Sequence, residues 1–272
     1  MRAGGGGGRR RRHVRARPVA GPARGRIHQP ARPAPLWAAP LTAARYVGPM
    51  SLDAAVVAPL AVVPPKPRLR GTLHLVAFPV SLVTGTILVV GVADTPTERW
   101  GCLVFAVATS VLFGVSALYH RGTWPPRTNA LLRRLDHSNI FLMIAGTYTP
   151  ICLALLDGTA RAVVLAVVWI GALAGIVFRV AWLSAPAWLY TPFYVALGWV
   201  AIAVLPSLAR AGGGSIVALI VAGGLAYSLG GLVYALKRPD PAPATFGYHE
   251  VFHTCTLVGF ACHYVAVVLA VS

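Results

Sequence analysis

The residues of this chain best suited to chemistry are histidines and one aspartate set in apolar surroundings. His249 and His253 belong to the string HEVFH and are four residues apart. On a helix this spacing places both imidazoles on one face, about 6 Å apart along the axis, so both can reach one ion. A third imidazole from His120 would give a three-histidine set, the ligand type of a catalytic zinc with a fourth position open to water.

Two further residues are candidates for acting on a water bound to that zinc. Asp136 would lie outside the ligand set and hold the water or accept its proton, and Ser116, one helical turn before His120, would hydrogen-bond the water or a substrate oxygen. Each residue also has a plainer interpretation. The histidine pair and the serine can serve helix packing alone, and Asp136 can pair with Arg133 or Arg134 at the membrane interface.

The elements that must position these residues are membrane-spanning helices. Of the 272 residues, 57% are hydrophobic and only 11% are charged, whereas soluble globular chains carry about 25% charged residues. A soluble enzyme is therefore excluded. Apolar stretches of about 20 residues recur from Thr72 onward, each long enough to cross a bilayer as a helix. We predict an all-α integral membrane bundle of seven transmembrane helices at about 72–93, 100–120, 135–156, 161–182, 189–209, 215–236 and 249–271.

The distribution of Lys and Arg predicts the orientation of this bundle. Residues 1–70 hold 14 of the 24 Lys and Arg residues, and most of the others fall on the same side of the predicted membrane. Because positive charge favours the cytoplasmic side, we expect the N-terminus in the cytoplasm and the C-terminus outside. All five candidate residues then lie at the cytoplasmic ends of their helices. This common depth favours the metal site over five separate packing roles.

The N-terminal segment differs from the rest of the chain. Residues 1–49 are rich in Arg, Gly, Ala and Pro and cannot bury enough apolar surface to fold. We therefore predict a disordered basic tail at residues 1–69 and a membrane domain at residues 70–272. The tail would contact anionic lipid. The alternative, which we favour, is that Met50 is the true start. Although the net charge is +17, most of it lies in the tail, and we expect no nucleic-acid partner.

A second motif interpretation is that HEVFH is the H-E-x-x-H helix of a zinc protease, with Glu250 as general base. Intramembrane metalloproteases draw a third ligand from an Asp-Gly motif, here Asp157–Gly158. That motif is predicted at the outer end of the third span, about 30 Å from His249. We do not favour the protease for this reason.

The remaining histidines in the spans are given no ligand role. We expect His74 at the membrane interface and His137 turned away from the face of Asp136. His263 is too far along its helix to share an ion with His249 and is expected to be a core histidine.

Four strings of this sequence resemble the bacterial hemolysin III proteins, a branch of the progestin and adipoQ receptor superfamily. They are RGTLH (70–74), SALYHR (116–121), RRLDHSNIFLMIAGTYTP (133–150) and GYHEVFH…GFACHY (247–264). The resemblance implies a seven-helix bundle of the cell membrane with a cytoplasmic N-terminus and one zinc near the inner face. The S-x-x-x-H motif of that family falls on Ser116 and His120, its aspartate on Asp136, and its H-x-x-x-H on His249 and His253.

The resemblance also suggests a distant kinship with alkaline ceramidases, membrane zinc enzymes that hydrolyse lipid amides. The expected function is then a zinc-dependent hydrolase of membrane lipid amides or esters. In it Asp136 would accept the proton of the water and Ser116 would stabilise the oxyanion. The alternatives are a membrane-lytic protein with a structural zinc, and a sensor of lipids or membrane state without turnover. Three histidine ligands leave room for water, and seven stable spans do not suit a toxin that leaves the membrane, so we favour the hydrolase.

Overall fold

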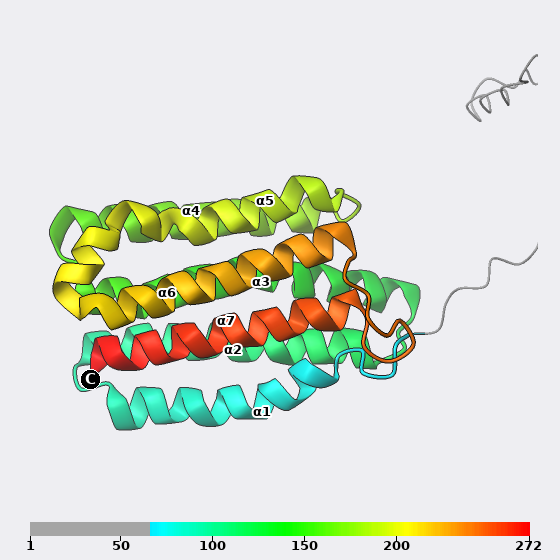
Figure 1. The fold of residues 1–272 in the computed structure, drawn as a ribbon, viewed down its shortest axis with the longest axis horizontal. Coiled ribbons are helices and arrows are strands. Elements are labelled where there is room, and N and C mark those ends of the chain that lie inside the picture. Colours follow the sequence, from blue (N-terminus) through cyan, green and yellow to red (C-terminus); the bar gives the residue numbers. More distant parts are fainter. Residues whose placement is uncertain (1–65) are drawn as a thin grey trace, which may run out of the picture. The chain divides into compact units, whose positions relative to one another are not determined.

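The computed structural model describes residues 66–272. Residues 1–65, which hold most of the predicted tail and the alternative start at Met50, lie outside the described residues. The described part is all-α and has no strand. Its helices are α1 (Thr72–Thr86), α2 (Pro96–Arg121), α3 (Pro126–Leu155), α4 (Gly158–Ala181), α5 (Ala187–Gly198), α6 (Leu205–Leu236) and α7 (Tyr248–Val271), with a π-helix η2 (Ile87–Val92) after α1 and a 3-10 helix η3 (Trp199–Val204) between α5 and α6 (Figure 1).

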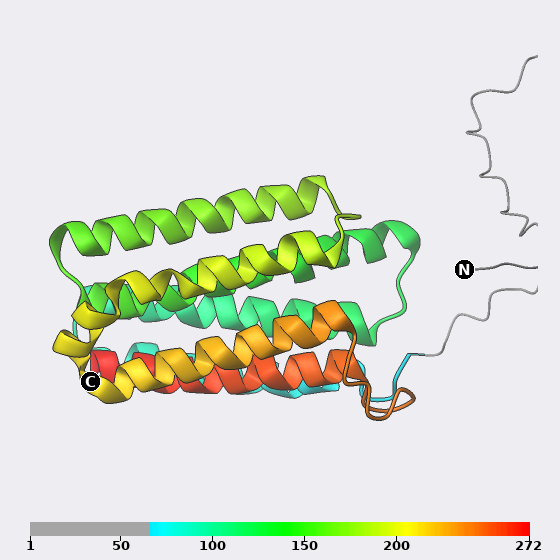
Figure 2. The same ribbon diagram turned by 45° about the horizontal axis from the view of Figure 1, so that its top comes forward.

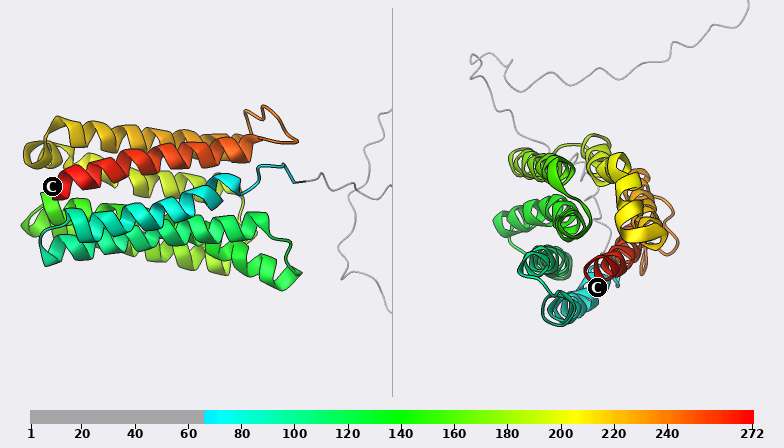
Figure 3. Two further views of the ribbon diagram at one scale, coloured as in Figure 1. Left: turned by 90° about the horizontal axis from the view of Figure 1, so that it is seen from below. Right: turned by 90° about the vertical axis from the view of Figure 1, so that its left-hand side faces the viewer.

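The helices pack side by side as one bundle. Seen along the helix axes, α1 to α4 follow one another on one side, and α5, α6 and α7 lie on the other (Figure 3, right). Helix α3 contacts α2, α4, α5, α6 and α7, which makes it the central element. The segments before α1 and before α7 lie at the same end of the bundle (Figure 1), so the residues at the starts of these helices can meet there.

Within residues 66–272, six helical stretches are long and apolar enough to cross a membrane. One of them, Trp188–Leu236, has 49 residues and would be about 74 Å long as a straight helix, far more than the roughly 30 Å of a bilayer core. It is not straight. Gly213 leaves the helical conformation with φ 80°, and the chain reverses direction in this region, so that α5 and most of α6 run alongside each other in opposite directions (Figure 2).

One predicted boundary is wrong. Helix α3 begins at Pro126, earlier than the predicted start at residue 135, because proline is well tolerated in the first helical turn, where its missing N–H has no hydrogen bond to make. The predicted break at residues 210–214 coincides with the kink at Gly213.

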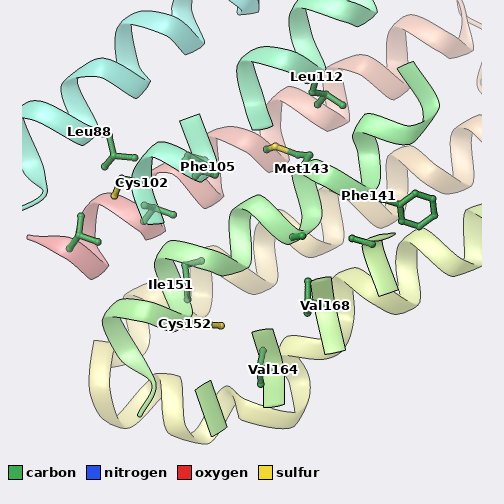
Figure 4. Close-up of a cluster of buried hydrophobic side chains, with 14 of the residues drawn as sticks. Leu88, Cys102, Phe105, Leu112, Phe141, Met143, Ile151, Cys152, Val164 and Val168 are labelled. Carbon is green, nitrogen blue, oxygen red and sulfur yellow. The ribbon is translucent and has the colours of Figure 1, made fainter. Parts of the chain in front are cut away.

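The core lies between α2, α3, α4 and α7, and Figure 4 shows part of it. Phe105, Phe141 and Val168 are almost completely buried, whereas apolar residues on the outside, such as Val90 and Ile170, are exposed. Small residues bring the central helices together: a Cβ atom added at Gly146 of α3 would lie 2.6 Å from the Cβ of Ala108 on α2. Close backbone approach of this kind drives helix association in membranes.

Candidate metal centre

Three histidines from two helices meet at one end of the bundle. His120 lies in the last turn of α2, and His249 and His253 lie in the first two turns of α7; all three are buried. The Nε2 atoms of His120 and His249 are 3.1 Å apart, and one ligand atom from each of the three residues lies within 4.8 Å of the others. Ligand nitrogens on a tetrahedral zinc are about 3.4 Å apart. The cluster can therefore hold one metal ion.

The segment that precedes α1 is fitted against His120. Gly71 has φ +77°, a conformation that favours glycine, and a Cβ added there would lie 2.7 Å from the Cβ of His120. The neighbouring residues are tied to the loop before α7, because the backbone N–H groups of Arg68 and Leu69 donate to the carbonyls of Ala244 and Thr245. These two hydrogen bonds tie the segment before α1 to the loop before α7.

Glu250 fixes the start of α7. Its Oε1 lies 2.8 Å from Nε of Arg70, and its Oε2 accepts a hydrogen bond of 2.9 Å from the backbone N–H of Gly247. The side chain is only 1% exposed. Both carboxylate oxygens are thus engaged in holding the helix that carries His249 and His253, which leaves Glu250 unsuited to be the general base of an H-E-x-x-H protease.

The position of Asp157 also disagrees with a protease. Asp157 precedes α4, at the end of the bundle opposite to the start of α7 (Figure 1). Its side chain is 98% exposed and pairs with Arg161 at 2.8 Å. It lies at the wrong end to join the histidines.

Asp136 and Ser116 lie beside the three histidines. Oδ2 of Asp136 is 3.7 Å from Nε2 of His120, and the Asp136 side chain is 11% exposed. Ser116 is buried next to this carboxylate, and both residues line one cavity. Within residues 66–272 the charged contacts of Asp136 are histidines, with no ion pair to Arg133 or Arg134.

His137 does not turn away from Asp136 as predicted. Its Nε2 is 4.0 Å from Oδ2 of Asp136, and its Nδ1 contacts a guanidinium nitrogen of Arg179. Because arginine can only donate, Nδ1 accepts, and a neutral His137 then carries its proton on Nε2, the atom that faces Asp136. Sequence reasoning assigned no role to Arg179. The sequence did carry a signal for it, because Arg179 is a lone arginine within an apolar span and a buried charge there requires partners.

Arg179 is completely buried in α4. Its guanidinium carbon lies 4.2 Å from the centroid of the Tyr190 ring, and Nη1 donates to the carbonyl of Trp182 at 3.4 Å. Aromatic faces attract a guanidinium most strongly where water is absent. Arg179 thereby connects α4 and the start of α5 to the residues around Asp136.

The prediction of an interfacial His74 is wrong as well. His74 is 3% exposed, and its ring stacks on that of His253 with centroids 3.8 Å apart and planes 8° apart. It shares the packed face of α1 with Ala77, Ser81 and Gly85, all buried and spaced at helical intervals. This spacing of small residues was the signal in the sequence that could have placed His74 inside. Its ring limits the positions that His253 can take.

An apolar cavity opens from the histidines into the bundle. Its volume is about 140 Å³, and it is lined by residues of α2, α3, α5, α6 and α7. Asp136, His249 and His253 lie at one end, and Tyr227 and His263 lie further along. An apolar cavity with a few convergent polar groups is the usual form of a ligand site.

Comparison with known proteins gives the family. A family model described as "Haemolysin-III related" matches residues 63–264. The chain belongs to the haemolysin III family. The match includes Ser116, His120, Asp136, His249 and His253.

Two relatives of this haemolysin III chain carry the family name. "Hemolysin-3 homolog" of Bacillus subtilis (strain 168) is 34% identical over 158 residues, which cover 58% of this chain and 71% of the relative. "Hemolysin-3" of Bacillus cereus is 32% identical over 158 residues, which cover 58% and 69%. With its apolar helices, the family membership makes this chain a multi-pass protein of the cell membrane, in contact with lipid.

Proposed function

We propose that this haemolysin III protein crosses the membrane seven times, with its N-terminus in the cytoplasm. The reversal near Gly213 divides Trp188–Leu236 into two crossings, so that every odd-numbered crossing starts at the end of the bundle that holds the histidines. Apart from the buried Arg179, the helix ends and loops after α1 carry six positive residues at that end of the bundle and three at the other; they are Arg121, Arg127, Arg133, Arg134, Lys237 and Arg238, against Arg99, Arg161 and Arg210. The positive-inside rule then places the histidines near the cytoplasmic face.

We further propose that His120, His249 and His253 hold a zinc ion. Their donor set supports this assignment, since imidazole suits zinc and three ligands leave a position for water. When bound, the zinc supplies an acidified water and polarises a carbonyl group.

The residues of the chain supply the rest of the proposed reaction, which is hydrolysis of a lipid amide or ester. Asp136, beside His120, accepts the proton of the attacking water and returns it to the leaving group. The hydroxyl of Ser116 donates to the carbonyl oxygen as negative charge develops there. The apolar cavity takes the acyl chain and excludes water from it. One observation carries the proposal: three buried imidazoles, a carboxylate and a hydroxyl lie at one end of an apolar cavity.

The first test is the metal content of the full chain purified in detergent and supplied with zinc. We expect about one zinc per chain in the wild type, loss of the metal in His253→Ala, and retention in Asp136→Ala. Thr254→Ala is the matched control, because Thr254 is next to His253 on α7 but exposed. Loss of metal from Asp136→Ala would show that the carboxylate is a ligand. A wild type without metal would overturn the hydrolase.

The second test is turnover, measured as release of fatty acid from ceramides and lipid esters in mixed micelles. Asp136→Ala should keep its zinc and lose about 100-fold or more in rate, because proton transfer by a positioned group contributes at least this much. Equal rates in Asp136→Ala and the wild type would exclude the role assigned to the carboxylate.

The name of the relatives supports a second candidate function, membrane lysis with a structural zinc. Leakage of dye from lipid vesicles distinguishes the two functions. A lytic protein releases dye from vesicles of a lipid that it does not hydrolyse, whereas a hydrolase acts on the lipid without such leakage.

A further inference from the structure

Besides the three-histidine cluster, the cavity contains a second polar site. This second site lies well away from His120, His249 and His253. Tyr227 of α6 and His263 of α7 both line the cavity, with ring centroids 5.4 Å apart. Nε2 of His263 donates to the carbonyl of Ile220 at 3.1 Å, so its Nδ1 is a bare acceptor. Within residues 66–272, neither this Nδ1 nor the hydroxyl of Tyr227 has a hydrogen-bond partner, although both atoms are buried.

Other polar groups in this part of the cavity are satisfied by the protein. Ser228 donates to the carbonyl of Gly224 at 2.7 Å and accepts from Nε1 of Trp199 at 2.8 Å. Thr147 donates to the carbonyl of Met143 at 2.8 Å. Buried polar groups are normally paired, so the two open atoms of Tyr227 and His263 require a partner from outside residues 66–272.

The packing of α6 against α7 is built around these two side chains. A Cβ added at Gly223 of α6 would lie 2.4 Å from the ring of His263, and one added at Gly259 of α7 would lie 2.7 Å from the ring of Tyr227. Each ring therefore fits against a glycine of the opposite helix. This reciprocal arrangement holds both rings in place at the wall of the cavity.

We propose that Tyr227 and His263 recognise a hydroxyl group in the middle of a lipid acyl chain. A hydroxyl both donates and accepts, so it can donate to Nδ1 of His263 and accept from the hydroxyl of Tyr227. The inference rests on the proposed function, which places the carbonyl end of the lipid at His253. His263 lies ten residues further along α7, about 15 Å by helix rise, and an extended chain covers this distance with roughly 12 carbon atoms.

The test is a binding competition with the full chain, zinc-loaded in detergent. Stearate, 12-hydroxystearate and 2-hydroxystearate compete against radiolabelled palmitate. We expect 12-hydroxystearate to bind about tenfold more tightly than stearate, the effect of one or two added hydrogen bonds. The 2-hydroxy isomer, whose hydroxyl cannot reach Tyr227, should show no such gain.

Two variants test whether the preference for 12-hydroxystearate over stearate depends on Tyr227. Tyr227→Phe should bind stearate as the wild type does and lose most of the preference for 12-hydroxystearate. Tyr234→Phe is the matched control, because Tyr234 lies on the same helix and lines the same cavity nearer to His249, and it should keep the preference.

The outcomes separate this inference from the proposed function. Equal binding of stearate and 12-hydroxystearate by the wild type would overturn the hydroxyl site, leave the acyl cavity intact and indicate that water alone occupies the site. Binding of none of the three fatty acids would overturn the acyl cavity itself, and the hydroxyl site with it. The comparison within the wild type decides the matter even if Tyr227→Phe fails to fold.

Discussion

The two ends of the cavity differ in the charged groups that surround their polar atoms. At the end near the three-histidine cluster, Asp136 lies between His120 and His137, and His137 is held by Arg179, while both ring nitrogens of His74 and Nδ1 of His253 have no hydrogen-bond partner within residues 66–272. At the other end, the hydroxyl of Tyr227 and Nδ1 of His263 have no partner within residues 66–272.

This difference distinguishes two kinds of site. Polar groups that are paired with one another fix their geometry before a ligand arrives, as a reaction centre requires. Polar groups left open in an apolar wall are completed only by a ligand, which makes them determinants of specificity. Changes at the first end should therefore affect the fold and the rate, and changes at the second should affect the choice of lipid.

The largest effect is expected from Glu250→Ala, which removes the partner of Arg70 and the acceptor for the backbone N–H of Gly247. We expect a loss of about 3 kcal/mol in the free energy of unfolding, because breaking a buried ion pair leaves a charge uncompensated. Thermal unfolding in detergent measures this loss. Glu250→Gln, which keeps an acceptor, should lose less. A Glu250→Ala protein as stable as the wild type would show that the paired end does not hold the fold together.

The next effect in size is expected from Gly223→Ala at the open end. The added Cβ would lie 2.4 Å from the ring of His263, and this ring cannot withdraw without losing its hydrogen bond to Ile220. Overpacking of this kind costs about 2 kcal/mol of stability. The same variant should also lose the preference for the hydroxylated chain. Unchanged stability together with an unchanged preference would mean that the ring is not held by this contact.

The sequence predicted the positions of the helices better than it predicted the contacts between side chains of different helices. Helix positions followed from apolar length, and the three-histidine cluster followed from helical spacing and common depth, because both depend on local periodicity. Residues 1–65, which include most of the predicted tail, lie outside the described residues. The boundary at Pro126 was missed because proline was interpreted as a loop signal rather than as a first-turn residue.

What the sequence could not supply was the contact made by each side chain across the bundle. His74 and His137 were assigned from their position along one helix, whereas their surroundings are set by other helices. The ring of His74 meets His253 from α7, and His137 meets Arg179 from α4. Such contacts depend on rotation and crossing of helices, which periodicity in one segment does not determine.

A smaller effect on rate is expected from His137→Phe. The substitution removes the N–H group that faces Asp136 at 4.0 Å, and it also removes the acceptor of the buried Arg179 guanidinium, so some stability is lost as well. Loss of a group that orients a reacting side chain typically lowers activity by at least tenfold, so we expect about a tenfold lower rate of lipid hydrolysis with zinc content unchanged. The measurement is turnover beside metal analysis. A rate equal to that of the wild type would show that His120 and Ser116 alone hold the carboxylate in place.

The smallest effect is expected from Gly224→Ala, one residue from Gly223. A Cβ at Gly224 would have as its nearest neighbour an atom of Trp199 at 3.4 Å, an ordinary contact. Alanine also favours helix over glycine, by roughly 0.5–1 kcal/mol, which offsets any crowding. The free energy of unfolding, measured by thermal unfolding in detergent, should thus change by less than about 0.5 kcal/mol. If Gly224→Ala destabilised the protein as much as Gly223→Ala, α6 would need small residues for packing in general. The contact between Gly223 and His263 would then not be specific.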